Sequence, residues 1–356
     1  MVPAERRLRR LPEHSERWTG VFYPGSAKTI RIAADAGAPT EGKKSMAMNT
    51  RRDFLKTGTA ALLCGSTVFR NSPLTAESKH GGQYLNLPLG IQLYSVRDLL
   101  PTDYEGTLKQ IADLGYREVE AAGFYNHSAS QVKQAMQQAS LRCVSGHYSY
   151  TDLTTQFDQT IAFAKEVGLN YIICPSPSHK NPLQYRGTHP RGQAPAFTLE
   201  EWRWNADQFN QIGKKVHAAG LKFGFHNHTM SFRKQDGILP YDELMRLTDP
   251  AYVTMEMDCG WVVVGGGDPI ELLRRYPTRI SMLHVKDFNK TGNPPSFGEH
   301  PTSTALGQGS IDYGPIFKAA AQTGHIKHCF VEQEQYNMPP MQELKINAEY
   351  MRKLHA

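Results

Sequence analysis

From Leu89 onward, short apolar and β-branched runs alternate with longer segments in which apolar residues recur at helical spacing. This alternation is typical of βα units, which assemble into parallel sheets. Eight strands are predicted, at residues 89–94, 117–121, 143–147, 170–174, 222–227, 253–258, 280–285 and 329–334. Helices are predicted between them, for example at residues 104–114 and 201–219.

Glycines separate several of these helices from the strand that follows. Gly115, Gly168, Gly220 and Gly324 each stand between a helical segment and an apolar run, and glycine readily adopts the left-handed conformation that ends many helices. Eight βα units favour an α/β fold closed into a single (β/α)8 TIM barrel, because closure leaves no sheet edge unpaired. An open doubly wound sheet is the alternative, but no Gly-x-Gly-x-x-Gly motif follows the first strand.

The segment ahead of the barrel has the features of an export signal. Residues 50–56 read TRRDFLK, a twin-arginine motif, and a short apolar run at 58–69 follows it. This run is too short to span a bilayer, which takes about 20 residues. We therefore interpret residues 46–76 as a cleaved twin-arginine signal peptide, with a retained anchor as the alternative. The protein is then exported by the twin-arginine machinery to the periplasm or beyond.

The remaining boundaries follow from the signal and the first strand. Residues 1–45 are interpreted as a disordered tail or an over-extended gene start, residues 77–87 as a linker, and residues 88–356 as the barrel. Residues 1–76 carry 13 Lys and Arg against six Asp and Glu, so the formal net charge of +6 leaves about −1 for the remainder. The barrel therefore lacks the excess positive charge that is typical of proteins that bind nucleic acid.

Two long segments follow predicted strands, at residues 175–200 and 288–313. Connections that follow barrel strands lie on the carboxyl-end face, where barrel active sites are built. Long connections on that face are commonly lids. We therefore expect both segments to lie beside an active site, with mobile insertions of no catalytic role as the alternative.

Ionisable residues end four of the predicted strands. The sequences are His226-Asn227-His228, Glu256-Met257-Asp258, His284-Val285-Lys286-Asp287 and Glu332-Gln333-Glu334. Alternate strand residues face the same way, so these groups should converge in one partly buried cavity. Burying them without compensation costs several kcal/mol each, and a divalent cation satisfies such groups. Mixed imidazole and carboxylate donors suit Mn²⁺, Zn²⁺, Co²⁺ or Fe²⁺ better than Mg²⁺.

These segments resemble the xylose-isomerase-like superfamily of sugar phosphate isomerases and epimerases, over roughly residues 88–354. The matching stretches, in order, are GIQLYS, FGFHNH, MEMDCGW, LHVKD, LGQGSIDY and FVEQE. The resemblance implies one divalent metal ion, a sugar or sugar derivative as substrate, and a set of four metal ligands. Carried over position by position, these ligands are His226, Asp258, His284 and Glu332.

One position departs from the family pattern. Many members have Glu-Asn-His where this chain has His226-Asn227-His228. In epimerases of the family, glutamates from the fifth and eighth strands both bind the metal and move protons on opposite faces of the substrate. Either His226 is a ligand that works with a different acid/base partner, or the reaction is an isomerisation, dehydration or lyase step that needs one strong base.

The predicted function is a metal-dependent sugar isomerase or epimerase that abstracts a proton next to a carbonyl and passes through an enediolate. Glu332 or Glu334 is the predicted base, with His228, Lys286 or His147 as the group that returns the proton or polarises the substrate. The residues expected to contact substrate are His147, Trp261 and Tyr94. Glu256, one pleat below Asp258, is expected to hydrogen-bond a ligand histidine.

Three alternatives stay open. A lyase or hydratase acting on a 3-keto sugar or glycoside would use the same metal and base, whereas a non-catalytic sugar-binding barrel would need neither. An apurinic endonuclease would need further metal ligands and a basic face, which the charge of the barrel opposes. The Gly-Gln-Gly-Ser run at 307–310 is interpreted as a tight turn more readily than as a phosphate cradle, so an unphosphorylated substrate is expected.

Overall fold

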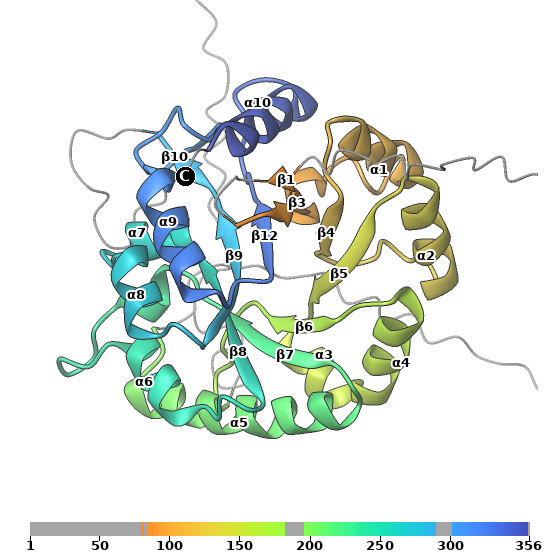
Figure 1. The fold of residues 1–356 in the computed structure, drawn as a ribbon. Coiled ribbons are helices and arrows are strands. Elements are labelled where there is room, and N and C mark those ends of the chain that lie inside the picture. Colours follow the sequence, from red (N-terminus) through yellow and green to blue (C-terminus); the bar gives the residue numbers. More distant parts are fainter. Residues whose placement is uncertain (1–79, 82–84, 182–195, 290–300, 355–356) are drawn as a thin grey trace, which may run out of the picture. The chain divides into compact units, whose positions relative to one another are not determined.

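The computed structural model describes residues 80–81, 85–181, 196–289 and 301–354. Within them, eight parallel strands close into a barrel in the order β12-β3-β4-β5-β6-β7-β8-β9 (Figure 1). The strands are β3 (Gly90–Gln92), β4 (Glu118–Ala121), β5 (Arg142–His147), β6 (Tyr171–Cys174), β7 (Lys222–His226), β8 (Val253–Asp258), β9 (Ile280–Val285) and β12 (His328–Val331). The predicted (β/α)8 barrel is confirmed, and each predicted strand is present.

Helices surround the barrel (Figure 1). They are α1 (Tyr104–Asp113), α2 (Ala129–Gln138), α3 (Tyr150–Thr155), α4 (Phe157–Val167), α5 (Leu199–Ala218), α6 (Pro240–Leu247), α7 (Cys259–Val264), α8 (Pro269–Arg275), α9 (Tyr313–Thr323) and α10 (Pro340–Lys353). The predicted helix-ending glycines are confirmed: Gly168 and Gly324 cap α4 and α9 with φ of +100° and +62°. Gly115 and Gly220, with φ of +95° and +83°, follow α1 and α5.

The first predicted strand is shorter than expected. β3 ends at Gln92 and not at Tyr94, because the Gln92 side chain accepts the Tyr94 N–H at 3.0 Å. This hydrogen bond begins a 3-10 helix, η1 (Leu93–Val96), which turns the chain away from the sheet. Tyr94 therefore lies beyond the strand end, on the carboxyl-end side of the barrel.

The last predicted strand also ends early. β12 stops at Val331, and the Gln333 N–H donates to the Ser95 hydroxyl at 3.0 Å instead of to a neighbouring strand. Glu332 and Glu334 consequently follow the strand and do not belong to it. A polar run at the end of a strand gives no sequence signal for the residue at which sheet pairing stops.

Residues 1–45 and the predicted signal at 46–76 lie outside the described residues. The predicted linker is described in part: β1 (His80–Gly81) pairs antiparallel with β2 (Leu87–Pro88) at the amino end of β3. Among the described residues, no helix has the length and apolar character needed to cross a membrane.

The two long connections on the carboxyl-end face are also described in part. In the second one, β10 (Asp287–Phe288) pairs antiparallel with β11 (Ser303–Thr304). Residues 182–195 and 290–300, where the predicted lids would fall, are outside the described part of the chain. The prediction that these segments are lids therefore stays a prediction.

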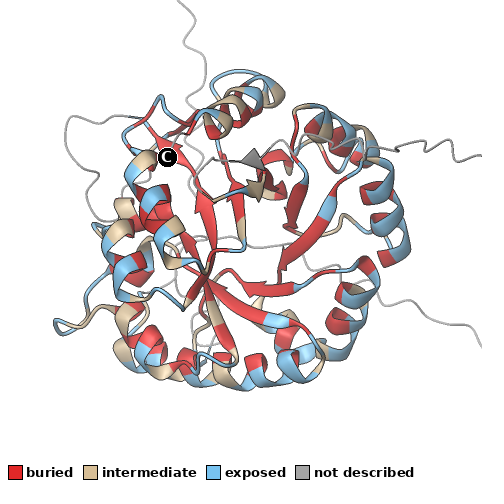
Figure 2. Cartoon of the chain, in the orientation of Figure 1, coloured by how far each residue is buried: buried red, intermediate tan, exposed pale blue. Residues whose placement is uncertain are grey.

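The barrel interior changes character along its axis, and its strands are mostly buried, apart from exposed first residues in β5 and β7 (Figure 2). At the amino end, Glu118 binds Arg142, and its other oxygen accepts a hydrogen bond from His328 Nδ1 at 2.8 Å. The middle of the interior is an apolar cluster of Val144, Tyr171, Ile173, Met282 and Phe330. The carboxyl end is polar, and it holds the candidate site.

Two β-bulges decide which side chains face this interior. Val119 pairs with Cys143 but Glu120 pairs with Ser145, so Val144 is the extra residue in β5. Met255 pairs with Ile280 but Glu256 pairs with Met282, so β9 also carries one extra residue. Because a one-residue shift reverses which side chains face inward, each bulge resets the inward-facing set on its strand.

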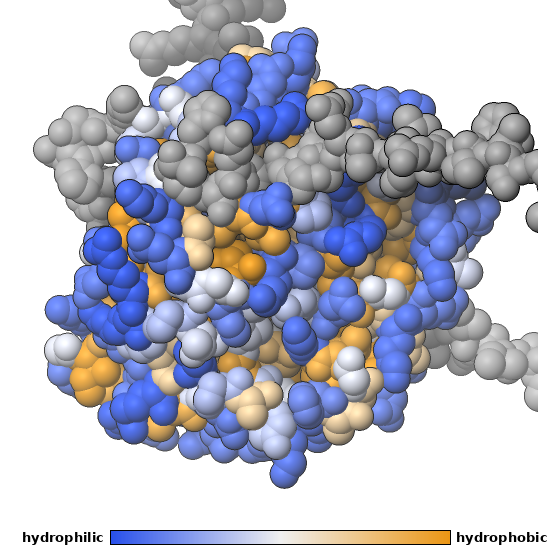
Figure 3. Space-filling model, viewed as in Figure 1, coloured by the Kyte–Doolittle hydropathy of each residue, from blue (hydrophilic) through white to orange (hydrophobic). Residues whose placement is uncertain are grey.

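The outer surface exposes few large hydrophobic side chains in the described part of the chain. Figure 3 shows hydrophobic patches interrupted by hydrophilic side chains on the face in view. In the described part of the chain, the large hydrophobic side chains that are exposed are Met230 and Met338, at 36% and 38%. Single residues of this kind are ordinary on protein surfaces and define no docking surface.

Candidate metal centre at the strand ends

Ionisable side chains from strand ends and from the residues just after them meet at the carboxyl end of the barrel. The strands supply Glu120 (β4), His147 (β5), His226 (β7), Glu256 and Asp258 (β8) and His284 (β9); His228 follows β7, Lys286 follows β9, and Glu332 and Glu334 follow β12. All except the half-buried His228 are buried. Charged side chains are rarely buried in such numbers without partners, so the arrangement of their partners identifies what the site can bind.

Three of the four predicted metal ligands offer donor atoms to a common centre. The Nδ1 atom of His284 lies 3.2 Å from Glu332 Oε2 and 3.9 Å from Asp258 Oδ2. His226 Nε2 lies 3.8 Å from the same Asp258 oxygen. Donor atoms held about 2.1 Å from a tetrahedral ion are roughly 3.4 Å apart, so these separations suit one cation. The fourth predicted ligand, His226, stands at the edge of the group formed by the other three.

We call Asp258, His284 and Glu332 the upper group. Asp258 Oδ1 accepts the Trp261 backbone N–H at 2.7 Å, whereas the buried Oδ2 faces the Lys286 ammonium at 3.0 Å. Burial, with added repulsion from Glu332, raises the pKa of the Asp258 carboxyl. A buried carboxylate oxygen that faces two imidazoles and a cation fits a position for a divalent metal ion, and imidazole with carboxylate is the donor set of Zn²⁺ and similar ions.

Lys286 places an ammonium group beside the upper group. Its Nζ lies 2.6 Å from Glu332 Oε2, 2.6 Å from Glu334 Oε1 and 3.0 Å from Asp258 Oδ2. It also lies 4.7 Å from the centre of the Trp261 ring, a cation–π contact. Burial alone lowers the pKa of Lys286, but the three carboxylates outweigh burial and raise it well above its ordinary value. The amine is therefore a protonated, resident cation.

The two glutamates after β12 have pKa values displaced in opposite directions. Burial raises the pKa of Glu332, but Lys286 and His284 outweigh it and hold that pKa far below the ordinary value. Burial and the neighbouring Glu332 charge raise the pKa of Glu334, although Lys286 opposes the shift. Because the two groups share one lysine, the first is ionised and the second is the more readily protonated.

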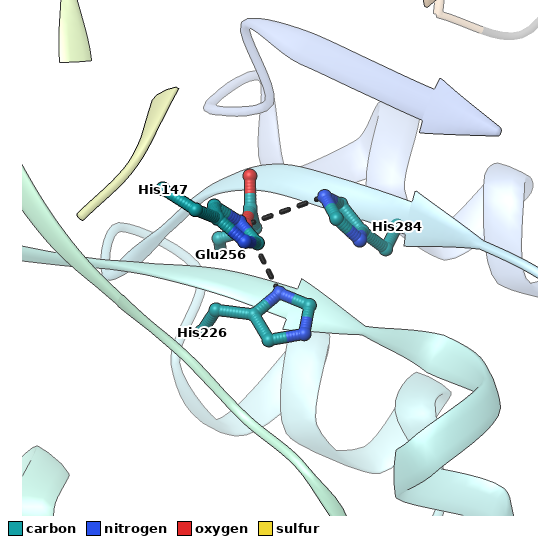
Figure 4. A group of neighbouring side chains, drawn as sticks. All are labelled: His147, His226, Glu256 and His284. Atoms are coloured by element: carbon teal, nitrogen blue, oxygen red, sulfur yellow. Dashed lines mark hydrogen bonds and ion pairs between the residues drawn. The ribbon is translucent and has the colours of Figure 1, made fainter. Parts of the chain in front are cut away.

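A second set of donors lies below the upper group. We call His147, His226, Glu256 and His284 the lower group; Figure 4 shows the three imidazoles gathered around the Glu256 carboxylate. Glu256 Oε2 lies 2.9 Å from His147 Nε2, 3.0 Å from His226 Nδ1 and 3.3 Å from His284 Nε2. The expected hydrogen bond between Glu256 and a predicted ligand histidine is therefore present: Glu256 Oε2 accepts from His226 Nδ1.

Glu120 completes this layer and was not among the sequence-based candidates. Its Oε1 lies 2.7 Å from His284 Nε2 and 2.9 Å from His147 Nε2. The same oxygen accepts from Gln92 Nε2 at 2.7 Å, and Oε2 accepts from the Ser145 hydroxyl. The available signal was a carboxylate inside an apolar strand, in the REVEA stretch.

The pKa values of His147 and His228 are shifted in opposite directions by their neighbours. Burial lowers the pKa of His147, but Glu120 and Glu256 raise it to about 9. Burial and Lys286 lower the pKa of His228 to about 3, and its Nδ1 has no hydrogen-bond partner among the described residues. His228 is thus a neutral imidazole at the edge of the site, with its ring centre 4.8 Å from that of His226.

The three predicted substrate contacts occupy different positions. His147 lies deep, with Nε2 between Glu120 and Glu256. Trp261 is buried against Lys286 and stands 6.0 Å from the His228 ring, so it forms one wall of the site. Tyr94 is half-buried beyond β3, with the Arg97 guanidinium 4.3 Å from its ring centre, and burial raises its pKa.

The glycine-rich run at 307–310 wraps a carboxylate of the chain itself. The backbone N–H groups of Gly307, Gly309 and Ile311 donate to the Asp287 carboxylate at 3.1, 3.0 and 3.1 Å. An added Cβ on Gly309 would meet Asp287 Oδ1 at 2.2 Å, so glycine is required there. These amides are occupied by a side chain, which agrees with a tight turn and leaves no phosphate cradle.

Comparisons with known proteins support this architecture. Inosose dehydratases from Clostridium beijerinckii and Lacticaseibacillus casei are 28% and 24% identical over 250 and 251 residues, about 65% of this chain and 82% of each relative. A solved sugar phosphate isomerase/epimerase from Parabacteroides distasonis has 27% identity and a TM-score of 0.60, covering 74% of this chain and 96% of that one.

A more distant structure shares the fold alone. The IolI protein, solved with a zinc atom, has 14% identity and a TM-score of 0.57 and covers 74% of this chain and 96% of its own. At this identity the likeness concerns the barrel and not the chemistry. A family model described as the xylose isomerase-like TIM barrel matches residues 108–354, most of the described barrel. The chain therefore belongs to the xylose isomerase-like TIM barrel family.

Proposed function

We propose that this chain is a divalent-metal-dependent enzyme that removes a proton next to the carbonyl of a sugar-derived substrate. The step that follows is elimination of water or an alcohol from the neighbouring carbon, which is lyase chemistry. The proposal places the metal on His226, Asp258, His284 and Glu332, at the barrel end where active sites lie. When bound, the metal supplies a Lewis acid that makes the C–H bond next to the carbonyl more acidic.

The observation that carries this proposal is the glutamate pair after β12. Glu332 and Glu334 each lie 2.6 Å from the Lys286 ammonium, yet their pKa values move in opposite directions. Two carboxyl groups whose pKa values are driven apart in one cavity are the usual arrangement of a base and an acid. Glu332 is assigned as the base and Glu334 as the acid.

In the proposed reaction, the C–H bond next to the carbonyl breaks and Glu332 takes the proton. The electron pair forms a carbon–carbon double bond, and the C–O bond on the next carbon breaks. Glu334 gives its proton to the departing oxygen, which leaves as water or as an alcohol. Solvent then restores the two protonation states, so the step needs no oxidant or reductant.

A two-base epimerisation fits these residues poorly. Glu332 and Glu334 come from one strand end, whereas epimerisation needs a second base on the other face of the substrate. Three strands away around the barrel, β7 is followed by Asn227 and His228 and ends in His226, where epimerases of the family have a glutamate, so that side of the site offers no carboxylate as the second base. Elimination and isomerisation each need one base on one face.

Isomerisation is the second candidate, because a base on one face also moves a proton between neighbouring carbons. The inosose dehydratases among the relatives favour elimination, and the Parabacteroides distasonis isomerase/epimerase structure favours isomerisation. The two reactions share the metal and Glu332 and differ in the use of Glu334. Elimination needs an acid for the departing oxygen, which is the role that the raised pKa of Glu334 suits.

Product analysis in D₂O tests the proposal. The protein is stripped with a chelator, reloaded with Mn²⁺, Co²⁺ or Zn²⁺, and incubated with an inosose, a set of ketoses and a set of 3-keto glycosides. We expect an unsaturated ketone that forms only with metal, detected by its ultraviolet absorbance and by NMR. A deuterated aldose or ketose would support isomerisation instead. Sugar binding without turnover would identify a non-catalytic barrel.

Two variants separate the base from the acid. Glu332→Gln should lose both the exchange of the substrate C–H with solvent deuterium and the product, because no base is left. Glu334→Gln should keep exchange but lose most of the elimination. The control is Glu349→Gln, a partly exposed glutamate on α10, away from the strand ends. If both site variants lost exchange equally, the division of roles would be wrong.

We further propose that the protein is exported by the twin-arginine route, because of the TRRDFLK motif and the apolar run behind it. Replacing both Arg51 and Arg52 with lysine should leave the precursor in the cytoplasmic fraction. Cell fractionation and immunoblotting measure this. Undiminished export of the double variant would overturn the assignment.

A further inference from the structure

The two predicted histidine ligands present different nitrogens to the two halves of the site. His284 faces the upper group with Nδ1, 3.2 Å from Glu332, and faces Glu120 with Nε2 at 2.7 Å. His226 faces Asp258 with Nε2 at 3.8 Å, and faces Glu256 with Nδ1 at 3.0 Å. In both rings, one nitrogen points to the metal position and the other meets a carboxylate beneath it.

We propose that Glu120 and Glu256, bridged by His147, form a supporting layer that fixes the tautomer and the orientation of His284 and His226 toward the metal. The inference rests on the proposed metal site and deepens it. Glu120 is its main new element, since neither the sequence pattern nor the family resemblance singled it out. It is a positioning residue, because it acts through His284.

The chemistry of imidazole explains how such a layer works. A neutral imidazole has one N–H group and one lone pair, and the hydrogen bond made by the N–H determines which nitrogen is free to bind metal. A carboxylate on Glu120 holds the proton of His284 on Nε2, so the Nδ1 lone pair faces the metal. Glu256 does the same for His226 with the nitrogens exchanged. Partners of this kind also make the ligand nitrogen more basic.

Glu120 is itself held in place by four neighbours. Gln92, His147 and His284 meet its Oε1, and the Ser145 hydroxyl donates to its Oε2. It is fully buried, so a small rotation would break several hydrogen bonds at once. Residues on β3, β5 and β9 together therefore fix the orientation of the Glu120 side chain. The fixed carboxylate in turn restrains the His284 ring.

A second metal ion in the lower group is the competing occupant. Glu256 Oε1 has no hydrogen-bond partner among the described residues, which leaves an acceptor available. The distances favour hydrogen bonds, however: Glu256 Oε2 lies 2.9 to 3.3 Å from three ring nitrogens. Donors around a tetrahedral ion stand roughly 3.4 Å apart, and the positions on Glu120 are already taken.

The test compares Glu120→Gln with Glu118→Gln. Glu118 is an equally buried glutamate on the same strand, but it binds Arg142 and His328 at the amino end of the barrel. Calorimetric titration of the metal-free full chain with Zn²⁺ or Co²⁺ gives affinity and stoichiometry. We expect one ion per wild-type chain, binding about 10 to 100 times weaker in Glu120→Gln, and unchanged affinity in Glu118→Gln even if both variants lose stability.

A second measurement does not require metal. In protein with ¹⁵N-labelled histidine, the ring signals of His284 report which nitrogen carries a proton. We expect a slowly exchanging Nε2 proton in the wild-type and in Glu118→Gln, and fast exchange of that proton with solvent in Glu120→Gln. If the wild-type bound no metal, the proposed cofactor would be refuted, while these signals would still decide the role of Glu120.

Either of two outcomes would overturn the inference. One is equal metal affinity and unchanged His284 signals in Glu120→Gln, which would reduce Glu120 to a packing residue. The other is a stoichiometry of two ions in the wild-type and one in Glu256→Gln, which would make the lower group a metal site of its own.

Discussion

Replacing Lys286 with methionine should destabilise the metal-free protein and strengthen metal binding. The ammonium is 1% exposed and is the cation nearest to Asp258, Glu332 and Glu334. Methionine keeps much of the side-chain volume but leaves three carboxylates with one cation fewer. Removing one partner of a buried ion pair costs about 3–5 kcal/mol, because an uncompensated charge remains. We expect a loss of that size in the free energy of unfolding.

Metal should reverse much of this loss. In the wild-type, the lysine ammonium lies within 3.0 Å of Asp258 Oδ2 and 2.6 Å of Glu332 Oε2, both donors of the predicted metal. An incoming ion must therefore compete with a resident cation, and in the variant it does not. We expect metal to bind at least about tenfold tighter, which is about 1.4 kcal/mol. An ion at about 100 times its dissociation constant adds about 2.7 kcal/mol of stability.

The assay is urea unfolding of chelator-treated protein with and without Mn²⁺, Co²⁺ or Zn²⁺, together with a direct metal titration. Lys222→Met is the matched control: this lysine is exposed at the start of β7, and its loss should change stability by less than about 0.5 kcal/mol. If Lys286→Met bound metal no more tightly than the wild-type, the lysine would not share the metal's position. If it were as stable as the control without metal, the carboxylates would not depend on this cation.

Three further changes have defined outcomes. Arg246 and Arg203 lower the pKa of Glu243 to about 2, so the ionised carboxylate stabilises the fold above its unfolded pKa near 4.5. Glu243→Gln should therefore cost about 1 kcal/mol of unfolding free energy at neutral pH. In urea titrations, this stability difference between variant and wild-type should disappear as the pH falls from about 4.5 to about 2. Asp287→Ala removes the acceptor of three turn amides and should cost about 3 kcal/mol, with faster hydrogen exchange of those amides; unchanged exchange would contradict this. Gly90→Ala would set a Cβ 2.4 Å from a β12 backbone oxygen, so calorimetry should show a loss of about 1–3 kcal/mol.

The sequence was most informative where one pattern followed from one physical cause. Apolar runs predicted the strands, because a parallel barrel buries both faces of its sheet. Glycines marked helix ends, as at Gly168, because few other residues accept a φ of +100°. Ionisable residues at strand ends were recognisable because that position exposes them to a shared cavity. These features are local, and short stretches of sequence carry them.

The supporting layer depends on non-local geometry. Glu120 and His147 meet only because a bulge adds one residue to β5, and no local pattern marks that residue. Which His284 nitrogen faces the metal position depends on its two carboxylate partners. Glu120 on β4 meets Nε2 and Glu332 after β12 meets Nδ1, and both are distant from His284 in sequence. Lys286 was predicted as a substrate contact or proton donor, and its place among three carboxylates follows from folding three strand ends together.

Stability and ligand positioning are linked in this barrel, because the same groups serve both. Barrel interiors are usually filled by branched apolar side chains, but the level below the metal position here consists of Gln92, Glu120, Ser145, His147 and Glu256. Each of these groups gives up hydration and is compensated by the others, so a change at one leaves its partners unpaired. An ordinary apolar layer would be more tolerant of substitution but would leave both imidazoles free to rotate. The polar layer restrains both rings, because rotating either one breaks its contact with a buried carboxylate, and a single well-placed metal needs ligands held in that way.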